Sequence, residues 1–536
     1  MSGFADYEQY DALGLADLVR RGKVTPAELL EAAIARVEAR NPKVNAVIMP
    51  LYDHGRRAIA DGLPDGLFRG VPFLLKDLGA PLTGTTMTRG SRFFADTPPA
   101  TFDSENVARL KRAGLVIFGR TNSCEVGLSL TCEPRLYGPT RNPWDPTRIS
   151  SGSSGGAAAA VGARMLPMAH ASDGFGSIRA PAASCGLVGL KPTRGRNTFA
   201  PVTGEGLGGC STEHAVTLSV RDSAALLDAT HGPGPGDPYT APPPTRPYLE
   251  ECGASPRPLR IAYTTLPPNG APIDPESLAT LQDTVRLCAQ LGHHVEEADP
   301  EIERGVVIPT FITLAAVNTV VNLSTHPTAG RPAVEGEVET VTWNTARIGE
   351  RTSSAHYVRA TQTAHRLGRQ MAAFHSRYDV LLTPGLGQLP VKLGWIDMMM
   401  DDVEEYWRRV FAFSPFTVWF NLTGQPAMML PIGHSASGLP VAVQLVARFG
   451  DEATLFRLGS QLEAAESCRR GRLPTGRLRH PLAGFAALRA AHRTRGAHSA
   501  ATREPPPPPP GRSRSSPLTR SPAGRESQAS AAGLGG

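Results

Sequence analysis

The stretch at residues 152–177, GSSGGAAAAVGARMLPMAHASDGFGS, decides how this chain is interpreted. Two glycine- and serine-rich segments stand at its ends, the first carrying Ser153 and the second Ser177. Between them, 157–164 is rich in the strong helix former alanine, and 165–169 has the apolar character of a strand. A loop, a helix, a strand and a second loop in this order return the two serines to the same end of one sheet.

A lysine at the end of an apolar segment is the third residue of interest. Residues 71–75, VPFLL, predict a short strand that ends at Lys76, and 116–119 predicts another strand. Helices are expected within 11–40, where a threonine, a proline and a glutamate give a capping signal. Lys76 is therefore expected at a strand end, which is a common place for chemistry in an α/β sheet.

These segments, in this order, resemble the amidase signature family of serine hydrolases. In that family a lysine, a Ser-Ser-Gly-Gly loop and an Asp-x-Gly-Gly-Ser segment form the site, and the separation of Ser153 and Ser177, 177 − 153 = 24, is the family's spacing. The resemblance covers about residues 12–466. Within the family, 170–173 and 209–214 are most similar to general amidases and to 6-aminohexanoate-cyclic-dimer hydrolases, which act on nylon oligomers. Further landmarks are Gly70-Val71-Pro72, Gly119-Arg120-Thr121-Asn122, Asn142-Pro143-Trp144-Asp145-Pro146, Gly189-Leu190-Lys191-Pro192 and Asn421-Leu422-Thr423-Gly424-Gln425-Pro426.

The resemblance implies hydrolysis of a carbon–nitrogen amide bond by a Ser-cisSer-Lys mechanism. Ser177 is the expected nucleophile, Ser153 the proton relay with a cis peptide bond before it, and Lys76 the base. Serine–lysine arrangements activate a hydroxyl where no histidine is supplied. Lys76 must be neutral when it acts, so burial and nearby donors have to lower its pKa by about 2–3 units, or about 3–4 kcal/mol. The reaction passes through an acyl-enzyme and implies no cofactor and no metal.

The segment before the nucleophile is expected to stabilise the oxyanion that forms during attack. Ser154 and Asp173 are expected to brace the two loops. Phe175 stands where many family members have glycine, and we expect it to adopt an allowed conformation with its ring toward the substrate. Ser150-Ser151 replaces the commoner Pro-Gly, which we interpret as variation within a subgroup. The expected oxyanion-hole donors are the backbone N–H groups of Gly174, Phe175, Gly176 and Ser177.

The fold that the resemblance implies is a large twisted mixed β-sheet with helices on both faces. Residues 258–323 and the helical segment 355–378 are expected to form part of the substrate side. Phe175 and apolar residues near 311–321 favour a hydrophobic or linear aliphatic amide, while a cyclic amide stays open. The expected partner is thus a small-molecule amide.

Three other interpretations stay open. Residues 152–156 also match G-x-S-x-G, the nucleophile elbow of α/β-hydrolases, with Ser154 as nucleophile. The glutaminase subunit of a tRNA-dependent amidotransferase shares the signature but works in a complex. A catalytically silent scaffold or nucleic-acid-binding protein would act through the basic tail of the chain. The presence of Lys76, Ser153 and Ser177 argues against a catalytically silent protein, because nothing compels a scaffold to keep all three residues.

The net charge of +6 is unevenly distributed along the chain. From Arg469 onward there are thirteen arginines and two acids, a balance of +11, so the rest carries 42 − 47 = −5. We therefore expect an amidase signature catalytic domain at 1–468 and a basic, Pro/Arg/Ser-rich disordered tail at 469–536. A shifted reading frame in a GC-rich gene would give the same tail composition, and a nucleic-acid partner is not expected. Truncation at Glu466 tests whether the tail is dispensable.

Cysteine usage and apolar segments bear on the compartment. The seven cysteines follow no zinc-binding spacing and fit reduced thiols in a cytoplasmic protein. Residues 1–18 carry acids where a signal peptide needs a basic start. The uncharged run 306–323 has the length of a membrane span, but its proline and polar residues predict a buried helix, so no membrane is expected. His170 and His214 are interpreted as structural hydrogen-bonding residues, and a homodimer stays open. The cysteines are Cys124, Cys132, Cys185, Cys210, Cys252, Cys288 and Cys468.

Overall fold

The computed structural model describes residues 4–469. Helices and strands alternate along this part of the chain and form two sheets, so the expected α/β class is confirmed. The described residues lie within one compact unit. The predicted catalytic domain 1–468 falls within that unit. The predicted tail 469–536 lies outside the described residues, apart from Arg469 at the end of helix α15.

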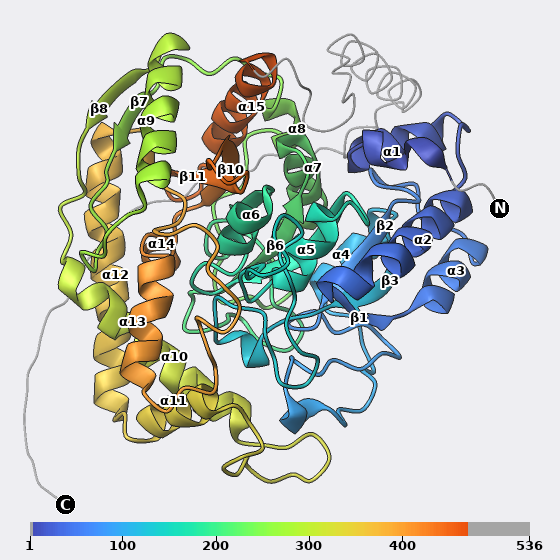
Figure 1. Cartoon of the computed structure of the whole chain (residues 1–536), viewed down its shortest axis with the longest axis horizontal. Coiled ribbons are helices and arrows are strands. Elements are labelled where there is room, and N and C mark those ends of the chain that lie inside the picture. Colours follow the sequence, from blue (N-terminus) through green and yellow to red (C-terminus); the bar gives the residue numbers. More distant parts are fainter. Residues whose placement is uncertain (1–3, 470–536) are drawn as a thin grey trace, which may run out of the picture. The chain divides into compact units, whose positions relative to one another are not determined.

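The larger sheet is mixed and has eight strands in the described part of the chain, in the order β4-β6-β5-β10-β11-β9-β7-β8. Neighbouring strands are antiparallel from β4 to β9, whereas β7 pairs in parallel with both β9 and β8. Figure 1 shows β7 and β8 beside helices α9 and α12. The strands are β4 (Met168–Asp173), β5 (Val188–Lys191), β6 (Thr212–Thr217), β7 (Arg260–Tyr263), β8 (His294–Glu297), β9 (Val380–Pro384), β10 (Ala427–His434) and β11 (Pro440–Ala447).

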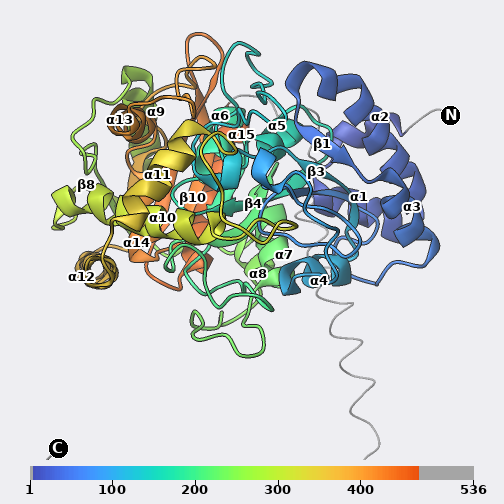
Figure 2. The ribbon, with the colours of Figure 1, turned by 90° about the horizontal axis from the view of Figure 1, so that it is seen from below.

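The smaller sheet has the order β1-β3-β2 and holds the predicted lysine. β2 (Pro72–Lys76) runs parallel to β3 (Val116–Thr121), and β1 (Val47–Pro50) runs antiparallel to β3. Every residue of β2 and β3 is buried. Figure 2 shows this sheet next to helices α1, α2 and α3. The two strands predicted at 71–75 and 116–119 are thus confirmed, with Lys76 as the last residue of its strand.

Helices cover both faces of the large sheet. Consecutive strand residues belong to different hydrophobic clusters, because side chains alternate between the faces of a sheet. Leu445 packs with residues of α9 and α15, whereas its neighbour Val446 packs with Trp419 and Phe420 of α14. The helices are α1 (Ala12–Arg20), α2 (Pro26–Val44), α3 (Tyr52–Ala60), α4 (Glu105–Arg112), α5 (Gly155–Gly162), α6 (Arg179–Cys185), α7 (Val220–Thr230), α8 (Tyr248–Glu251), α9 (Pro275–Gln290), α10 (Val307–Leu323), α11 (Thr340–Glu350), α12 (Ser354–Arg377), α13 (Val403–Phe413), α14 (Thr417–Thr423) and α15 (Glu452–Arg469).

The segment between the two serine loops differs from its prediction at both elements. The helix begins at Gly155 rather than 157, and the strand spans 168–173 rather than 165–169. Pro167 has no N–H to donate to a ladder, and pairing with β6 begins at Met168. The sequence order of loop, helix, strand and loop is nevertheless the predicted one.

The uncharged run near residue 310 forms one long helix, α10. The segment Arg304–Leu323 has the length and apolarity of a membrane span, and half of it is buried inside the protein. It packs against α11, α12 and α14. Val307, Phe311 and Leu314 are among its buried residues. The predicted buried helix is therefore present, and its covered side faces other helices of the same unit.

Candidate active site

Lys76 lies at the end of β2 with its side chain completely buried. Its Nζ atom donates a hydrogen bond to Oγ of Ser153 at 2.6 Å and another to Oγ of Ser172 at 3.0 Å. Ser153 comes from the loop before α5, and Ser172 comes from β4. The fold therefore brings the predicted lysine and the predicted relay serine into direct contact.

The loop that carries Ser153 is held closely against a neighbouring segment. The peptide bond between Gly152 and Ser153 is cis. A Cβ atom at Gly152 would lie 1.9 Å from the carbonyl oxygen of Thr131, so only glycine fits there. Ser153 itself is 2 % exposed. Its hydroxyl is thus shielded from bulk water in this structure.

Ser177 follows the second glycine-rich loop, two residues before α6. Its backbone carbonyl accepts a hydrogen bond from the N–H of Ser154 at 3.3 Å. The hydroxyl of Ser154 bonds to the backbone of Ser172, donating to its carbonyl at 3.2 Å and accepting from its N–H at 3.3 Å. Ser154 thus connects both loops to β4. Ser177 is 3 % exposed.

Asp173 organises the loop before Ser177. Its carboxylate accepts from the N–H of Gly176 at 2.7 Å and forms a fully buried ion pair with Arg179, 2.9 Å from Nε. Asn421 of α14 adds a further bond at 2.9 Å. Burial raises the pKa of Asp173, but the charge of Arg179 and the hydrogen bonds outweigh burial and hold the pKa below its ordinary value. The carboxylate therefore stays ionised and fixes the loop.

The four expected oxyanion-hole donors are not equivalent. The N–H of Gly176 is engaged by Asp173. Within residues 4–469, the N–H groups of Gly174, Phe175 and Ser177 donate no hydrogen bond. Gly176 has a φ of +136°, so the glycine and not Phe175 takes the conformation that side chains rarely adopt. Phe175 thus has the allowed conformation that was expected, and three of the four donors are uncommitted.

The charge state of Lys76 depends on its surroundings. Burial lowers the pKa of Lys76 to about 8, while the negative charges of Asp173 and Glu213 act against this lowering. A pKa of about 8 agrees with the lowering of two to three units that a lysine base requires. A substantial fraction of the side chain is therefore neutral near pH 7.5.

Phe175 belongs to a buried aromatic cluster. Its ring centroid lies 4.9 Å from that of Phe311 on α10 and 6.1 Å from that of Trp407 on α13. Phe311 and Trp407 also contact each other, at 6.2 Å. Phe175 is 2 % exposed, so its ring points into this cluster. Phe311, from the apolar segment near 311–321, thus packs directly against Phe175 of the nucleophile loop.

The residues that sequence analysis missed come from β4 and from the distant helix α14. Ser172 contacts Lys76, Asn421 contacts Asp173, and Thr417 donates to the carbonyl of Phe175 at 2.8 Å. Ser172 lies within the quoted stretch, and its position one residue before Asp173 was the available signal. Nothing local to the sequence ties residues 417 and 421 to the serine loops.

The model of the amidase family matches residues 28–456, which is most of the chain and includes both serine loops. The chain belongs to the amidase family. This amidase is therefore an amide hydrolase that acts on carbon–nitrogen bonds, which confirms the resemblance seen in the sequence. Its mixed sheet with helices on both faces is the fold of the amidase signature enzymes.

Several relatives are similar over nearly their whole length. The amidase is 38 % identical to the 6-aminohexanoate-cyclic-dimer hydrolase of Paenarthrobacter ureafaciens over 85 % of this chain and 94 % of that protein. A solved structure of 6-aminohexanoate cyclic dimer hydrolase with substrate has a TM-score of 0.81 at 36 % identity, covering 85 % of this chain and 97 % of the other. A glutamyl-tRNA(Gln) amidotransferase subunit from Thermotoga maritima has a TM-score of 0.69 at 26 % identity, covering 85 % and 95 %.

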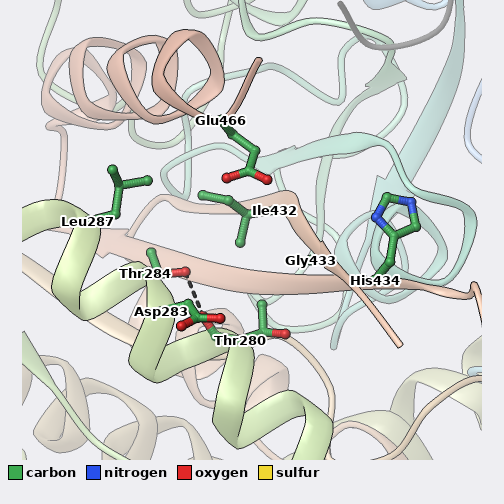
Figure 3. A pocket seen from close by; sticks show the side chains of 8 residues that line it. All are labelled: Thr280, Asp283, Thr284, Leu287, Ile432, Gly433, His434 and Glu466. Atoms are coloured by element: carbon green, nitrogen blue, oxygen red, sulfur yellow. Dashed lines mark hydrogen bonds between the residues drawn. The ribbon is translucent and has the colours of Figure 1, made fainter. Parts of the chain in front are cut away.

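A polar hollow of about 400 Å³ lies elsewhere on this amidase, between α9 and the end of β10 (Figure 3). Asp283 and Thr284 line it from α9, and His434 lines it from the strand side. None of its lining residues belongs to the serine loops or to β2, so it is not part of the candidate active site. Among residues 4–469, no three His, Cys, Asp or Glu side chains are grouped as metal ligands would be.

Proposed function

We propose that this amidase cleaves its substrate through an acyl-enzyme on Ser177, with Ser153 as proton relay and Lys76 as base. The observation that carries the proposal is the 2.6 Å contact between Nζ of Lys76 and Oγ of Ser153 inside a completely buried site. When the amine is neutral, its lone pair accepts the Ser153 proton while Ser153 takes the proton of Ser177. The lowered pKa of Lys76 supports this role.

The reaction has two halves. The Oγ atom of Ser177 attacks the amide carbon, and the proton that it loses passes through Ser153 to Lys76. The same proton returns to the leaving nitrogen as the carbon–nitrogen bond breaks, which releases the amine or ammonia. Water then attacks the acyl group, loses its proton along the same path and frees the carboxylic acid and Ser177.

Stabilisation of the oxyanion comes from the loop before the nucleophile. We place the N–H groups of Gly174, Phe175 and Ser177 around the developing negative charge, because Asp173 already engages the N–H of Gly176. Each donor aimed at an oxyanion contributes roughly a hundredfold or more to the rate. The ion pair between Asp173 and Arg179 keeps the loop in place before the substrate arrives.

We propose a linear or cyclic amide with an apolar chain as the substrate class. The aromatic cluster of Phe175 and Phe311 adjoins Trp407, which also lines a hollow of about 570 Å³ with apolar walls from α10 and α13. A volume of this size suits a small organic ligand. The cyclic dimer of 6-aminohexanoate, on which the named relatives act, is therefore the first substrate to assay.

Labelling with a fluorophosphonate probe tests the nucleophile directly. The full-length wild type, Ser177→Ala and Ser154→Ala are treated in parallel, and mass spectrometry locates the adduct. We expect an adduct on Ser177 in the wild type and in Ser154→Ala and no adduct in Ser177→Ala. An adduct on Ser154, or none on the folded wild type, contradicts the mechanism and favours the nucleophile elbow or a silent scaffold.

Competition among amides tests the substrate class. Apolar linear and cyclic amides should be hydrolysed faster than small polar amides, and a preference for the small polar amides would contradict the proposal. Glutamine is included because the tRNA-dependent amidotransferase subunit shares the fold. Efficient glutamine hydrolysis with no activity on simple amides would support that alternative. Salt-dependent RNA binding without hydrolysis would support the silent scaffold.

We also propose that the enzyme works in the cytoplasm. Six cysteines of the described part of the chain are unpaired, and five of them are buried. Free thiols fit a reducing compartment. Fractionation of the source cells, followed by an amide hydrolysis assay on each fraction, tests this proposal; activity in the secreted fraction would contradict it.

A further inference from the structure

One face of the β4–β6 pair is directed at Lys76. In β4, His170 and Ser172 are two residues apart and therefore point to the same side of the strand. Ser172 stands directly opposite Glu213 of β6 in the antiparallel ladder, which puts their Cβ atoms about 4.5–5.5 Å apart on one face. Ser172 bonds to Nζ of Lys76, so the side chain of Ser172 is the link between Glu213 and the lysine amine.

His170 lies on the same face, between the backbone of Lys76 and the side chain of Glu213. Its Nδ1 atom accepts the backbone N–H of Lys76 at 3.4 Å, so Nδ1 carries no proton. The ring proton is then on Nε2, which lies 3.8 Å from Oε2 of Glu213.

Glu213 is a buried carboxylate without an arginine or lysine partner in the described part of the chain. It is 2 % exposed, and its Oε2 atom accepts from Nδ2 of Asn106 on α4 at 2.8 Å. Its Oε1 atom has no hydrogen-bond partner there. A Cβ at Gly79, three residues after Lys76, would come within 2.5 Å of Oε1, so this carboxylate is packed against the segment that follows the lysine.

The other carboxylate near Lys76 differs in this respect. Asp173 is ion-paired with Arg179, whose guanidinium offsets its negative charge. The thiols that face Lys76, Cys124 and Cys132, have pKa values raised by burial and remain neutral near pH 8. Among the groups packed against Lys76, Glu213 is therefore the negative charge that no fixed cation offsets.

We propose that Glu213, held by Asn106 beside His170, is a positioning residue that stabilises the ammonium form of Lys76 during acylation of Ser177. The inference rests on the proposed function. The proton leaves Ser177 Oγ, passes through Ser153 and binds Nζ of Lys76, while Glu213 stays ionised and takes no proton. Its charge raises the pKa of Lys76 against the lowering that burial causes. Glu213 thus keeps Lys76 basic enough to receive the proton, as a carboxylate next to a catalytic base does.

The test is the pH dependence of the rate at which the fluorophosphonate probe labels Ser177 in the full-length enzyme. The neutral form of Lys76 is the base, so the rate rises with pH through the pKa of Lys76. Glu213→Gln removes the charge at nearly constant volume and should move this acid limb down by about one pH unit. A residue that only supports the fold would change the amount of active enzyme and leave the limb in place.

Two further variants complete the test. Glu463→Gln removes a carboxyl group on α15 whose charged neighbours are Asp11 and Arg221, and its limb should match that of the wild type. Glu213→Asp keeps the negative charge, so its acid limb should lie within a few tenths of a pH unit of the wild-type limb. If Glu213→Gln does not fold, Glu213→Ala takes its place as the variant that removes the charge. If Ser177 is labelled in Glu213→Gln but the acid limb stays in place or moves to higher pH, the role of Glu213 is overturned and the proposed function stands. Labelling that survives in Ser177→Ala overturns the proposed function instead.

Discussion

The Oγ atom of Ser172 accepts a hydrogen bond from Nζ of Lys76 at 3.0 Å, while the same nitrogen lies 2.6 Å from Oγ of Ser153. A neutral lysine amine has two N–H bonds and one lone pair. If one N–H is held by Ser172, rotation of the amine is restricted and the lone pair can be kept on Ser153. The second serine thus orients the base rather than taking part in proton transfer.

Replacing Ser172 by alanine should therefore lower kcat by about tenfold and leave KM nearly unchanged, since a hydrogen bond of about 1–1.5 kcal/mol is lost next to the base. Steady-state kinetics on the best amide substrate measures both constants. Ser184→Ala is the matched control, because the Ser184 hydroxyl is buried and has no hydrogen-bond partner in the described part of the chain. Equal losses in both variants would contradict the orienting role.

The acid limb of the pH–rate profile should report Lys76. Since the neutral amine is active and burial lowers its pKa to about 8, kcat/KM should rise with pH, reach half of its maximum near pH 8 and level off about one pH unit higher. Lys76→Met should remove this limb and lower the rate by at least about a hundredfold. A limb that persists in Lys76→Met would assign the titration to another group.

The ion pair between Asp173 and Arg179 should matter strongly for stability. Asp173→Asn leaves Arg179 as a buried charge without its partner, so we expect the free energy of unfolding to fall by about 3–5 kcal/mol at pH 7. Urea denaturation followed by circular dichroism measures this change. Because the folded pKa of Asp173 is lowered, the wild-type contribution is complete above the unfolded pKa near 4 and is lost as the pH falls through the folded pKa.

A surface pair provides the contrast for that measurement. Glu337→Gln breaks the pair with Arg331, which is nearly half exposed, and should cost less than about 1 kcal/mol. Similar losses for Asp173→Asn and Glu337→Gln would show that the buried pair does not hold the loop.

Gly176→Ala should disturb the loop before the nucleophile. The position has a φ of +136°, and the added Cβ would meet Oγ1 of Thr417 at 2.5 Å. We expect slower fluorophosphonate labelling of Ser177 and a loss of about 2 kcal/mol or more in stability. Gly236→Ala also has a positive φ, but no atom lies within 4 Å of its Cβ, so it separates backbone strain from collision. Unchanged labelling in Gly176→Ala would argue against a rigid oxyanion loop.

Removal of residues 470–536 should leave amide hydrolysis unchanged. The family match ends at residue 456, and α15, the last described helix, ends at Arg469. The comparison needs kcat/KM and soluble yield for the chain with and without this segment. A large loss of kcat/KM with normal folding would show that the segment contributes to the site.

Much of the site could be predicted because its residues are close in sequence or lie in segments typical of the family. Ser153 and Ser177 are 24 residues apart, and a loop, a helix and a strand return them to one end of the sheet. Lys76 was placed correctly because an apolar run ends at it. The start of β4 was misplaced by three residues, since 165–173 is buried throughout and offers no alternation to mark where pairing begins.

The supporting contacts could not be predicted in the same way. The bond from Thr417 to Phe175 and the bond from Asn421 to Asp173 join positions more than 240 residues apart. Such pairs leave no local pattern in a single sequence. The bond from the N–H of Gly176 to Asp173 depends on loop geometry rather than on residue type. The sequence therefore predicted four oxyanion-hole donors, whereas three of them donate no hydrogen bond in the structure.

The distance along the chain between the nucleophile loop and its supports affects how the enzyme matures. Arg179 bonds to Gln444 of β11 at 2.8 Å, and Asp173 bonds to Asn421 of α14. A growing polypeptide emerges from the ribosome with its N-terminal end first. Ser153 and Ser177 are therefore made long before the segments that hold their loops. A nascent chain shorter than about 444 residues lacks the contact with Gln444, so full activity should first appear only when synthesis is nearly finished.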